Sequence, residues 1–214
     1  MSYTLLPEHM LTRYEDWHRA DYQSQQELLA DLVDNGQHPE AMLISCCDSR
    51  MNVTSIFKAD PGDFFVHRNI ANLVPPYAPG MNNHGTSAAI EYAVTVLEVS
   101  RIIVMGHSQC GGVKGCHDMC SGNAPELENR SSFVGHWLEV LRPAFDRVAA
   151  SNTDHPVEAL EQEGIRVSIE NLMTFPFVSE RVNASQLELH GLWHDIRSGR
   201  LEALDPQSGA FEVV

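Results

Sequence analysis

The candidate metal ligands of this chain lie at or just beyond the ends of two apolar runs. Cys46 lies in the run 41–47, His107 closes the run 101–107, and Cys110 follows three residues later. Two thiolates and an imidazole favour zinc over magnesium or calcium. Three protein ligands leave the fourth tetrahedral position to water, as in catalytic zinc sites. The pattern therefore predicts one zinc ion per chain, bound by Cys46, His107 and Cys110.

A carboxylate and a guanidinium follow the first of these cysteines, at Asp48 and Arg50. Two thiolates neutralise the charge of the zinc ion, so such an ion acidifies its water less than a zinc held by three histidines. Another group must therefore favour the hydroxide. Arg50 can keep Asp48 ionised through a bidentate ion pair, and Asp48 can then accept a hydrogen bond from the hydroxide and orient it. The same carboxylate could instead move onto the metal and block it.

The elements that position these groups alternate between short apolar runs and helical patterns. We expect strands at 41–47, 64–69, 101–107 and 187–196, helices at 88–100, 133–148 and 154–173, helix caps within 82–86 and 131–132, and a hairpin or tail at 198–214. Strands separated by helices imply crossover connections, so the pattern predicts an α/β fold with a largely parallel central sheet flanked by helices. Cys46 and His107 then lie at the carboxyl ends of strands, where open α/β sheets place their sites.

The first part of the chain is polar and has a broken helical period. Residues 8–35 predict one or two helices that end at Asn35-Gly36. We expect residues 1–36 to form an N-terminal helical arm, packed on its own domain or around a partner. Residues 37–214 then form the zinc-containing catalytic α/β domain, in a chain that is a single domain overall.

Composition limits the compartment and the partners. The 214 residues carry 14 basic and 29 acidic side chains, a formal net charge of −15, which disfavours nucleic acid and anionic membrane surfaces. No apolar run reaches the ~18 residues of a membrane-spanning helix, and the first residues do not resemble a secretory signal. An odd number of cysteines, five, argues against a disulfide framework. We therefore expect a cytoplasmic protein.

Two motifs carry the candidate site, Cys46-x-Asp48-Ser49-Arg50 and His107-x-x-Cys110-Gly111-Gly112. Together they resemble the β-class carbonic anhydrases, and the resemblance extends over about residues 37–196. It implies a zinc lyase whose zinc-bound hydroxide converts carbon dioxide reversibly to bicarbonate and a proton. It also implies an α/β fold around a parallel sheet, and tight homodimers that often pair into tetramers or larger assemblies.

Within that family the chain is similar to the plant-type, openly active subgroup. Gln37, Phe65 and Tyr92 match the glutamine, phenylalanine and tyrosine of the substrate pocket. The resemblance implies that Gln37 donates a hydrogen bond to an oxygen of carbon dioxide or bicarbonate, while the two rings wall a small apolar pocket. Some bacterial members instead have an inhibitory bicarbonate site with a tryptophan three residues before the first cysteine ligand. Here Leu43 takes that place, although Arg68 matches another part of the site.

The remaining cysteines are not expected to bind the metal, and two other functions remain open for the chain. We expect Cys47 to be a core residue on the opposite strand face, and Cys116 and Cys120 to be thiols without a metal. One rival is the hydrolysis of a related molecule such as carbonyl sulfide or carbon disulfide. The other is a non-catalytic zinc protein or redox sensor, which would not need Asp48 and Arg50.

Assembly is predicted from the last apolar segment. Residues 187–196 contain several apolar side chains and are expected to be the terminal strand. An exposed apolar strand edge favours pairing with another chain. We therefore expect a second copy of the chain to cover this edge in a dimer.

Overall fold

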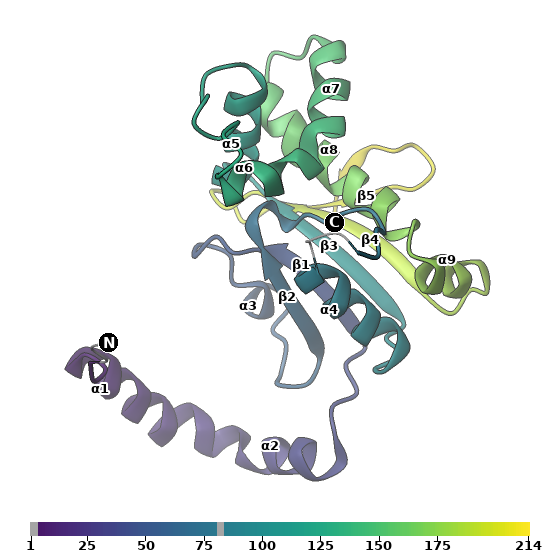
Figure 1. Cartoon of the computed structure of the whole chain (residues 1–214). Helices are drawn as coiled ribbons and strands as arrows, with labels where there is room; N and C mark the ends of the chain where they lie inside the picture. Colours follow the sequence, from purple (N-terminus) through teal and green to yellow (C-terminus); the bar gives the residue numbers. More distant parts are fainter. Residues whose placement is uncertain (1–3, 81–83) are drawn as a thin grey trace. The chain divides into compact units, whose positions relative to one another are not determined.

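In the computed structural model, which describes residues 4–80 and 84–214, six strands form one sheet in the order β2-β1-β3-β4-β5-β6 (Figure 1). The strands are β1 Ala41–Cys46, β2 Phe64–Asn69, β3 Arg101–His107, β4 Glu188–His194, β5 Leu201–Leu204 and β6 Phe211–Val213. The strands from β2 to β4 are parallel, and β5 and β6 extend the sheet antiparallel. The largely parallel sheet of an α/β fold is confirmed.

Helices connect the parallel strands and cover the sheet. They are α3 Val53–Ile56, η2 Ile70–Asn72, α4 His84–Thr95, α5 Gly111–Cys120, α6 Phe133–Leu138, η3 Glu139–Leu141, α7 Arg142–Ser151, α8 Pro156–Leu172 and α9 Pro176–Asn183. Every residue of β1 is buried. Met42 and Ile44 belong to one apolar cluster with Ile90 of α4, whereas Leu43 packs in another cluster with Val53 of α3. Burial of both faces explains why β1 is a continuous apolar run rather than an alternating one.

Two glycines let α8 approach the centre of the sheet. A Cβ on Gly106 of β3 would lie 2.8 Å from Cδ1 of Ile165, and a Cβ on Gly191 of β4 would lie 2.9 Å from Cγ2 of the same residue. Both distances are shorter than real Cβ contacts, so a side chain at either position would force Ile165 of α8 to move. The helix is therefore placed close behind the carboxyl end of β3 and the middle of β4.

Residues up to His38 form a separate unit. It contains α1 Glu8–Trp17, the π-helical turn η1 His18–Tyr22 and α2 Gln23–Asn35, and within these three elements no residue is buried. The chain leaves α2 at Gly36, whose φ of 86° suits a residue without a Cβ. The helices and their end at Asn35-Gly36 are confirmed. The role of this unit as an arm stays a prediction.

Two expected helices have different bounds. The helix expected at 88–100 ends at Thr95, because Leu97 donates its N–H to the carbonyl of Tyr92, five residues earlier rather than four, and Glu98 turns the chain with a φ of 51°. The expected cap begins at Asn82, which lies outside the described residues together with Asn83. The helix expected at 133–148 is divided into α6, η3 and α7, and a proline stands in the first turn of α7.

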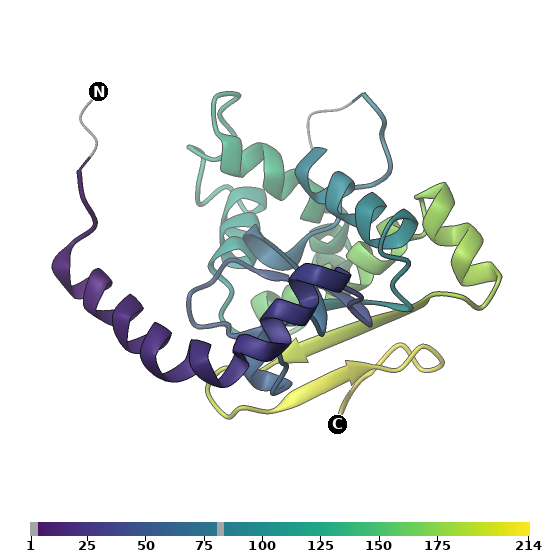
Figure 2. The same ribbon diagram turned by 90° about the horizontal axis from the view of Figure 1, so that it is seen from below.

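The expectation that residues 187–196 form an exposed terminal edge was wrong. β4 pairs with β3 on one side and with β5 on the other, and the β5–β6 hairpin continues the sheet (Figure 2). Asp195 and Asp205 shape the two turns by the same device, since each carboxylate accepts the side-chain O–H and backbone N–H of the serine three residues later. The sequence signal was the repeated Asp-x-x-Ser-Gly.

The helices give no sign of a membrane-spanning segment. Within the described residues, none is both long and apolar enough to cross a bilayer. The cytoplasmic location stays a prediction.

Candidate metal centre

Three side chains from two neighbouring strand ends converge in the sheet. Cys46 ends β1, His107 ends β3, and Cys110 follows just before α5; all three are buried. One ligand atom from each lies within 4.8 Å of the others, and the two sulfur atoms are 3.8 Å apart. Two sulfurs bound tetrahedrally at ~2.3 Å from a zinc ion are separated by about 3.8 Å. The spacing of the sulfur atoms therefore fits zinc.

The imidazole of His107 presents one nitrogen to this group. Nδ1 lies 2.9 Å from the carbonyl oxygen of Ser108, a geometry in which Nδ1–H donates and the lone pair is on Nε2. Nε2 is buried and has no hydrogen-bond partner among the described residues. A buried acceptor without a partner is costly, and a cation between the two sulfurs would satisfy it. The donor set is therefore complete for a metal ion with three protein ligands.

The two thiols share a proton when they have only each other as partners. A hydrogen bond from Cys110 lowers the pKa of Cys46, and the same interaction raises the pKa of Cys110. Ionisation of both in one buried site needs a nearby positive charge. A zinc ion would supply it.

Asp48 and Arg50 form a bidentate pair beside these ligands. Arg50 donates from Nε to Oδ1 of Asp48 over 2.9 Å and from Nη2 to Oδ2 over 2.6 Å. The backbone N–H of Arg50 also donates to Oδ1 over 3.0 Å. These hydrogen bonds hold the pKa of Asp48 well below its usual range. Oδ2 lies 3.9 Å from Nε2 of His107, so an ionised carboxylate borders the site.

Arg68 of β2 fixes the segment that carries this aspartate. Its Nε donates to the carbonyl of Cys46 over 2.9 Å and its Nη2 to the carbonyl of Asp48 over 2.8 Å. In the sequence, Arg68 matched only one part of the inhibitory bicarbonate site found in some members of the family. Its contacts instead connect Cys46, a candidate metal ligand, to Asp48 through one guanidinium.

Comparisons with known proteins agree with this geometry. A family model described as carbonic anhydrase matches residues 41–201. Beta carbonic anhydrase 3 of Arabidopsis thaliana is 35% identical over 178 residues, 81% of this chain and 67% of the relative. A carbonic anhydrase of Synechocystis is 35% identical over 191 residues, 87% of this chain and 67% of the relative. The chain thus spans about two thirds of the length of these relatives.

The chain belongs to the β-class carbonic anhydrases. The solved structure of the β-carbonic anhydrase CcaA has a TM-score of 0.86 and 32% identity, and the match covers 97% of this chain and 91% of that one. A tetrameric β-carbonic anhydrase of Sordaria macrospora gives a TM-score of 0.76 and 32% identity, with 95% of this chain and 97% of that one covered. The chain is accordingly an enzyme that hydrates carbon dioxide reversibly to bicarbonate and a proton.

The two aromatic residues predicted for the substrate pocket lie together, but apart from the ligands of their own chain. The rings of Phe65 and Tyr92 have centroids 5.8 Å apart. Phe65 is in register with Met42, four residues before Cys46, which is roughly 13 Å along the strand. The ring pair of this β-class carbonic anhydrase therefore does not line the metal centre formed by the same chain.

The predicted glutamine belongs to the other unit. Gln37 is exposed and follows α2, one residue before the unit ends at His38. Its contribution to substrate binding stays a prediction.

Sequence analysis missed Glu161, which lies behind the metal centre. This residue of α8 is 3% exposed, and its Oε1 accepts the backbone N–H of Cys110 over 3.0 Å. Its Oε2 accepts Nε1–H of Trp193 over 3.2 Å. Glutamates are common on helices, and only the close packing of α8 brings this one to Cys110.

The remaining cysteines have other surroundings. Cys47 is exposed, so its expected place in the core was wrong: β1 ends at Cys46 and the chain then turns, with the N–H of Met51 bonded to the carbonyl of Asp48. Cys116 and Cys120 lie one helical turn apart in α5 with their sulfurs 3.9 Å apart. Across the described ranges, the candidate metal-binding groups include Cys46, His107 and Cys110 and neither of these two thiols.

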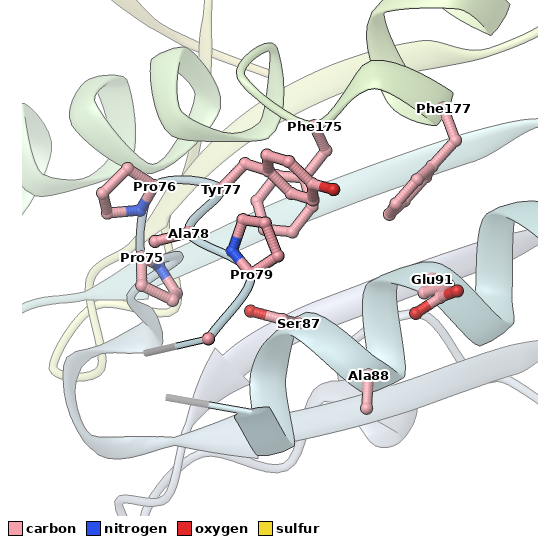
Figure 3. A pocket seen from close by; sticks show the side chains of 11 residues that line it. Pro75, Pro76, Tyr77, Ala78, Pro79, Ser87, Ala88, Glu91, Phe175 and Phe177 are labelled. Atoms are coloured by element: carbon pink, nitrogen blue, oxygen red, sulfur yellow. The ribbon is translucent and has the colours of Figure 1, made fainter. Parts of the chain in front are cut away.

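A cavity of about 420 Å³ lies elsewhere, between the loop 75–80, α4 and the beginning of α9. Figure 3 shows Tyr77 against Phe175 on one wall and Ser87 and Glu91 of α4 on the other. None of the metal ligands and neither member of the Asp48–Arg50 pair lines it. This β-class carbonic anhydrase therefore has its ligand cluster outside this cavity.

Proposed function

We propose that Cys46, His107 and Cys110 bind one catalytic zinc ion per chain and that Asp48 directs the nucleophile beside it. When bound, zinc supplies the Lewis acidity that makes water a nucleophile near neutral pH. The fit of the donor set carries the proposal: two sulfurs 3.8 Å apart face a buried imidazole nitrogen without a partner among the described residues.

The role of Asp48 follows from its ionisation and position. A carboxylate that stays charged can only accept hydrogen bonds. It therefore accepts the O–H of the nucleophile and leaves an oxygen lone pair directed at carbon dioxide. Arg50 donates to both oxygens of Asp48, including Oδ2, which is the one 3.9 Å from Nε2 of His107, and this bidentate hold keeps the carboxylate from turning onto the metal. Arg68 holds the backbone on which Asp48 stands.

The substrate pocket is proposed to be completed by a second copy of the chain. Phe65, Tyr92 and Gln37 are the proposed substrate-binding residues, and the ring pair lies too far from the ligands of its own chain to touch a substrate there. In a homodimer, or an assembly built from dimers, the rings of one copy can line the site of the other. The homologue from Sordaria macrospora is described as tetrameric, which supports such an assembly.

Zinc content and carbon dioxide hydration measured on the same preparation test the proposal. We expect about one zinc per chain and rapid hydration, with both lost in Cys46→Ser, His107→Ala and Cys110→Ser. Cys116→Ser and Cys120→Ser are matched controls, because they remove a thiol without touching the ligand group. Loss of zinc in these controls, with retention in the first three variants, would refute the ligand assignment.

A further inference from the structure

The peptide group between Gln109 and Cys110 is held from both sides. Its carbonyl accepts Nη2–H of Arg50 over 3.0 Å, and its N–H donates to Oε1 of Glu161 over 3.0 Å. In a trans peptide the two groups point in opposite directions. One peptide plane therefore connects the Asp48–Arg50 pair on one side with a buried carboxylate on the other.

The backbone at this point needs such support. Gln109 has a φ of 54°, a left-handed conformation that is uncommon for a residue with a Cβ. The two partners of the peptide are 59 and 51 residues away along the chain. Its orientation is thus set by long-range contacts, and rotation of the peptide would break both of them.

Glu161 is fixed for this task. Its two carboxylate oxygens accept from two different donors, Cys110 N–H and Trp193 Nε1–H, so the group cannot rotate without losing a hydrogen bond. The helix that carries it is set close to the sheet at Gly106 and Gly191. Burying a carboxylate is costly, and here the cost is offset by donors that include the backbone of a metal ligand.

We propose that Glu161 is a positioning residue of the metal centre, which holds the Gln109–Cys110 peptide so that Cys110 stays in ligand position and the Gln109 carbonyl faces Arg50. The inference rests on the proposed function, because it requires Cys110 to bind zinc. Glu161 touches neither substrate nor the reacting atoms. It acts through the peptide, and through Arg50 on the orientation of Asp48.

Zinc release and a cobalt spectrum test the inference without relying on activity. The rate of zinc loss to an excess of chelator is measured for the zinc-loaded protein, and the thiolate-to-metal absorption is recorded after substitution with cobalt(II). Loss of a group that orients a metal ligand costs on the order of 10–100-fold in metal affinity. We expect Glu161→Leu to release zinc about tenfold faster or more, with a changed cobalt spectrum.

A set of matched variants separates positioning from mere packing. In Glu161→Gln the amide oxygen can still accept from Cys110, but its NH2 group faces the N–H of Trp193. The double variant Glu161→Gln/Trp193→Phe removes that conflict, so we expect its zinc release to return towards the unmutated rate. Trp193→Phe alone removes one of the two donors that fix Glu161 but leaves the bond from Cys110 N–H in place, so it should release zinc more slowly than Glu161→Leu.

A double-mutant cycle tests whether Arg50 and Glu161 act on the same peptide. Once Arg50→Ala has freed the carbonyl, Glu161→Leu should accelerate zinc release by a smaller factor than it does in the unmutated protein. If the factors by which the two substitutions accelerate zinc release simply multiply in the double variant, the two residues are not coupled through the peptide. If Glu161→Leu does not fold, the glutamine variants replace it in the cycle.

Two results would contradict the inference. One is a folded Glu161→Leu protein with the zinc release and cobalt spectrum of the unmutated chain. The other, if that variant does not fold, is glutamine variants that match the unmutated protein in both measurements. Failure of the proposed function looks different: the unmutated protein would hold no zinc, or Cys110→Ser would retain it.

Discussion

Asp48 and Arg50 are joined by three hydrogen bonds, two from the guanidinium and one from the backbone N–H of Arg50. The guanidinium then reaches across the site to the carbonyl of Gln109. The pair is partly exposed, so its effect on overall stability is expected to be modest. Its effect on the site is larger, because it fixes the charge and the direction of the only carboxylate within 4 Å of Nε2 of His107 among the described residues.

The first prediction concerns this carboxylate. Asp48→Asn should retain zinc and lose activity by about two orders of magnitude or more. The amide is uncharged, and its NH2 group can donate a hydrogen bond at a position where the nucleophile needs an acceptor. Hydration rate and zinc content of the same sample check it. Asp118→Asn, which alters a half-buried carboxylate of α5 paired with Lys114, is the control. Near-normal turnover in Asp48→Asn would remove this residue from the mechanism.

The second prediction gives the pH dependence of the ion pair. Because Arg50 holds the pKa of Asp48 below its ordinary value, the pair stabilises the folded state above the ordinary carboxyl pKa of about 4. This contribution is lost as the pH falls through the lowered pKa. Arg50→Ala should therefore unfold in less urea at pH 7, and the difference from the unmutated protein should narrow below about pH 4. A difference independent of pH would contradict this account.

Much of the ligand set follows from the order of residues along the chain. Cys46 and His107 each close a buried run, and the parallel-sheet rule brings the carboxyl ends of neighbouring strands together. Cys110 lies only three residues after His107, so the end of the same strand brings it to the site. Asp48 and Arg50 are two residues apart and need only a local turn to pair. For these residues, side-chain type and sequence distance contain the information that the fold uses.

Other parts of the site depend on packing that no local pattern reveals. Glu161 reaches Cys110 because α8 sits close to the sheet, which in turn needs Gly106 and Gly191. Arg68 bonds to carbonyl groups, which every residue carries, so its partners have no sequence signal. The exposed Cys47 was misassigned because alternation along a strand predicts a face only while the strand continues.

The third prediction concerns the shared site. A Phe65→Ala chain keeps its ligands, and a Cys110→Ser chain keeps its rings. If the rings serve the other copy, randomly mixed dimers of two inactive chains contain one complete site in half of the dimers, giving about a quarter of full activity. Co-expression followed by a hydration assay measures this. Mixing Cys46→Ser with Cys110→Ser is the control that should recover nothing. An inactive first mixture would show that the rings and the ligands do not meet across copies.

The last prediction concerns bicarbonate and rests on Leu43, which is fully buried in the cluster with Met105 and Val53. A leucine has no indole N–H to offer an anion, so the inhibitory bicarbonate site of the locked family members should be weak here. Arg68 is the residue that such a site would share, and its guanidinium is already bonded to the carbonyls of Cys46 and Asp48. Arg50 should then keep Asp48 away from the metal at neutral pH.

We expect activity to fall gradually as the pH drops, and added bicarbonate to act only as product. Turnover measured against pH, with and without bicarbonate, checks this. A steep cooperative loss that bicarbonate deepens would show that the site is locked despite Leu43.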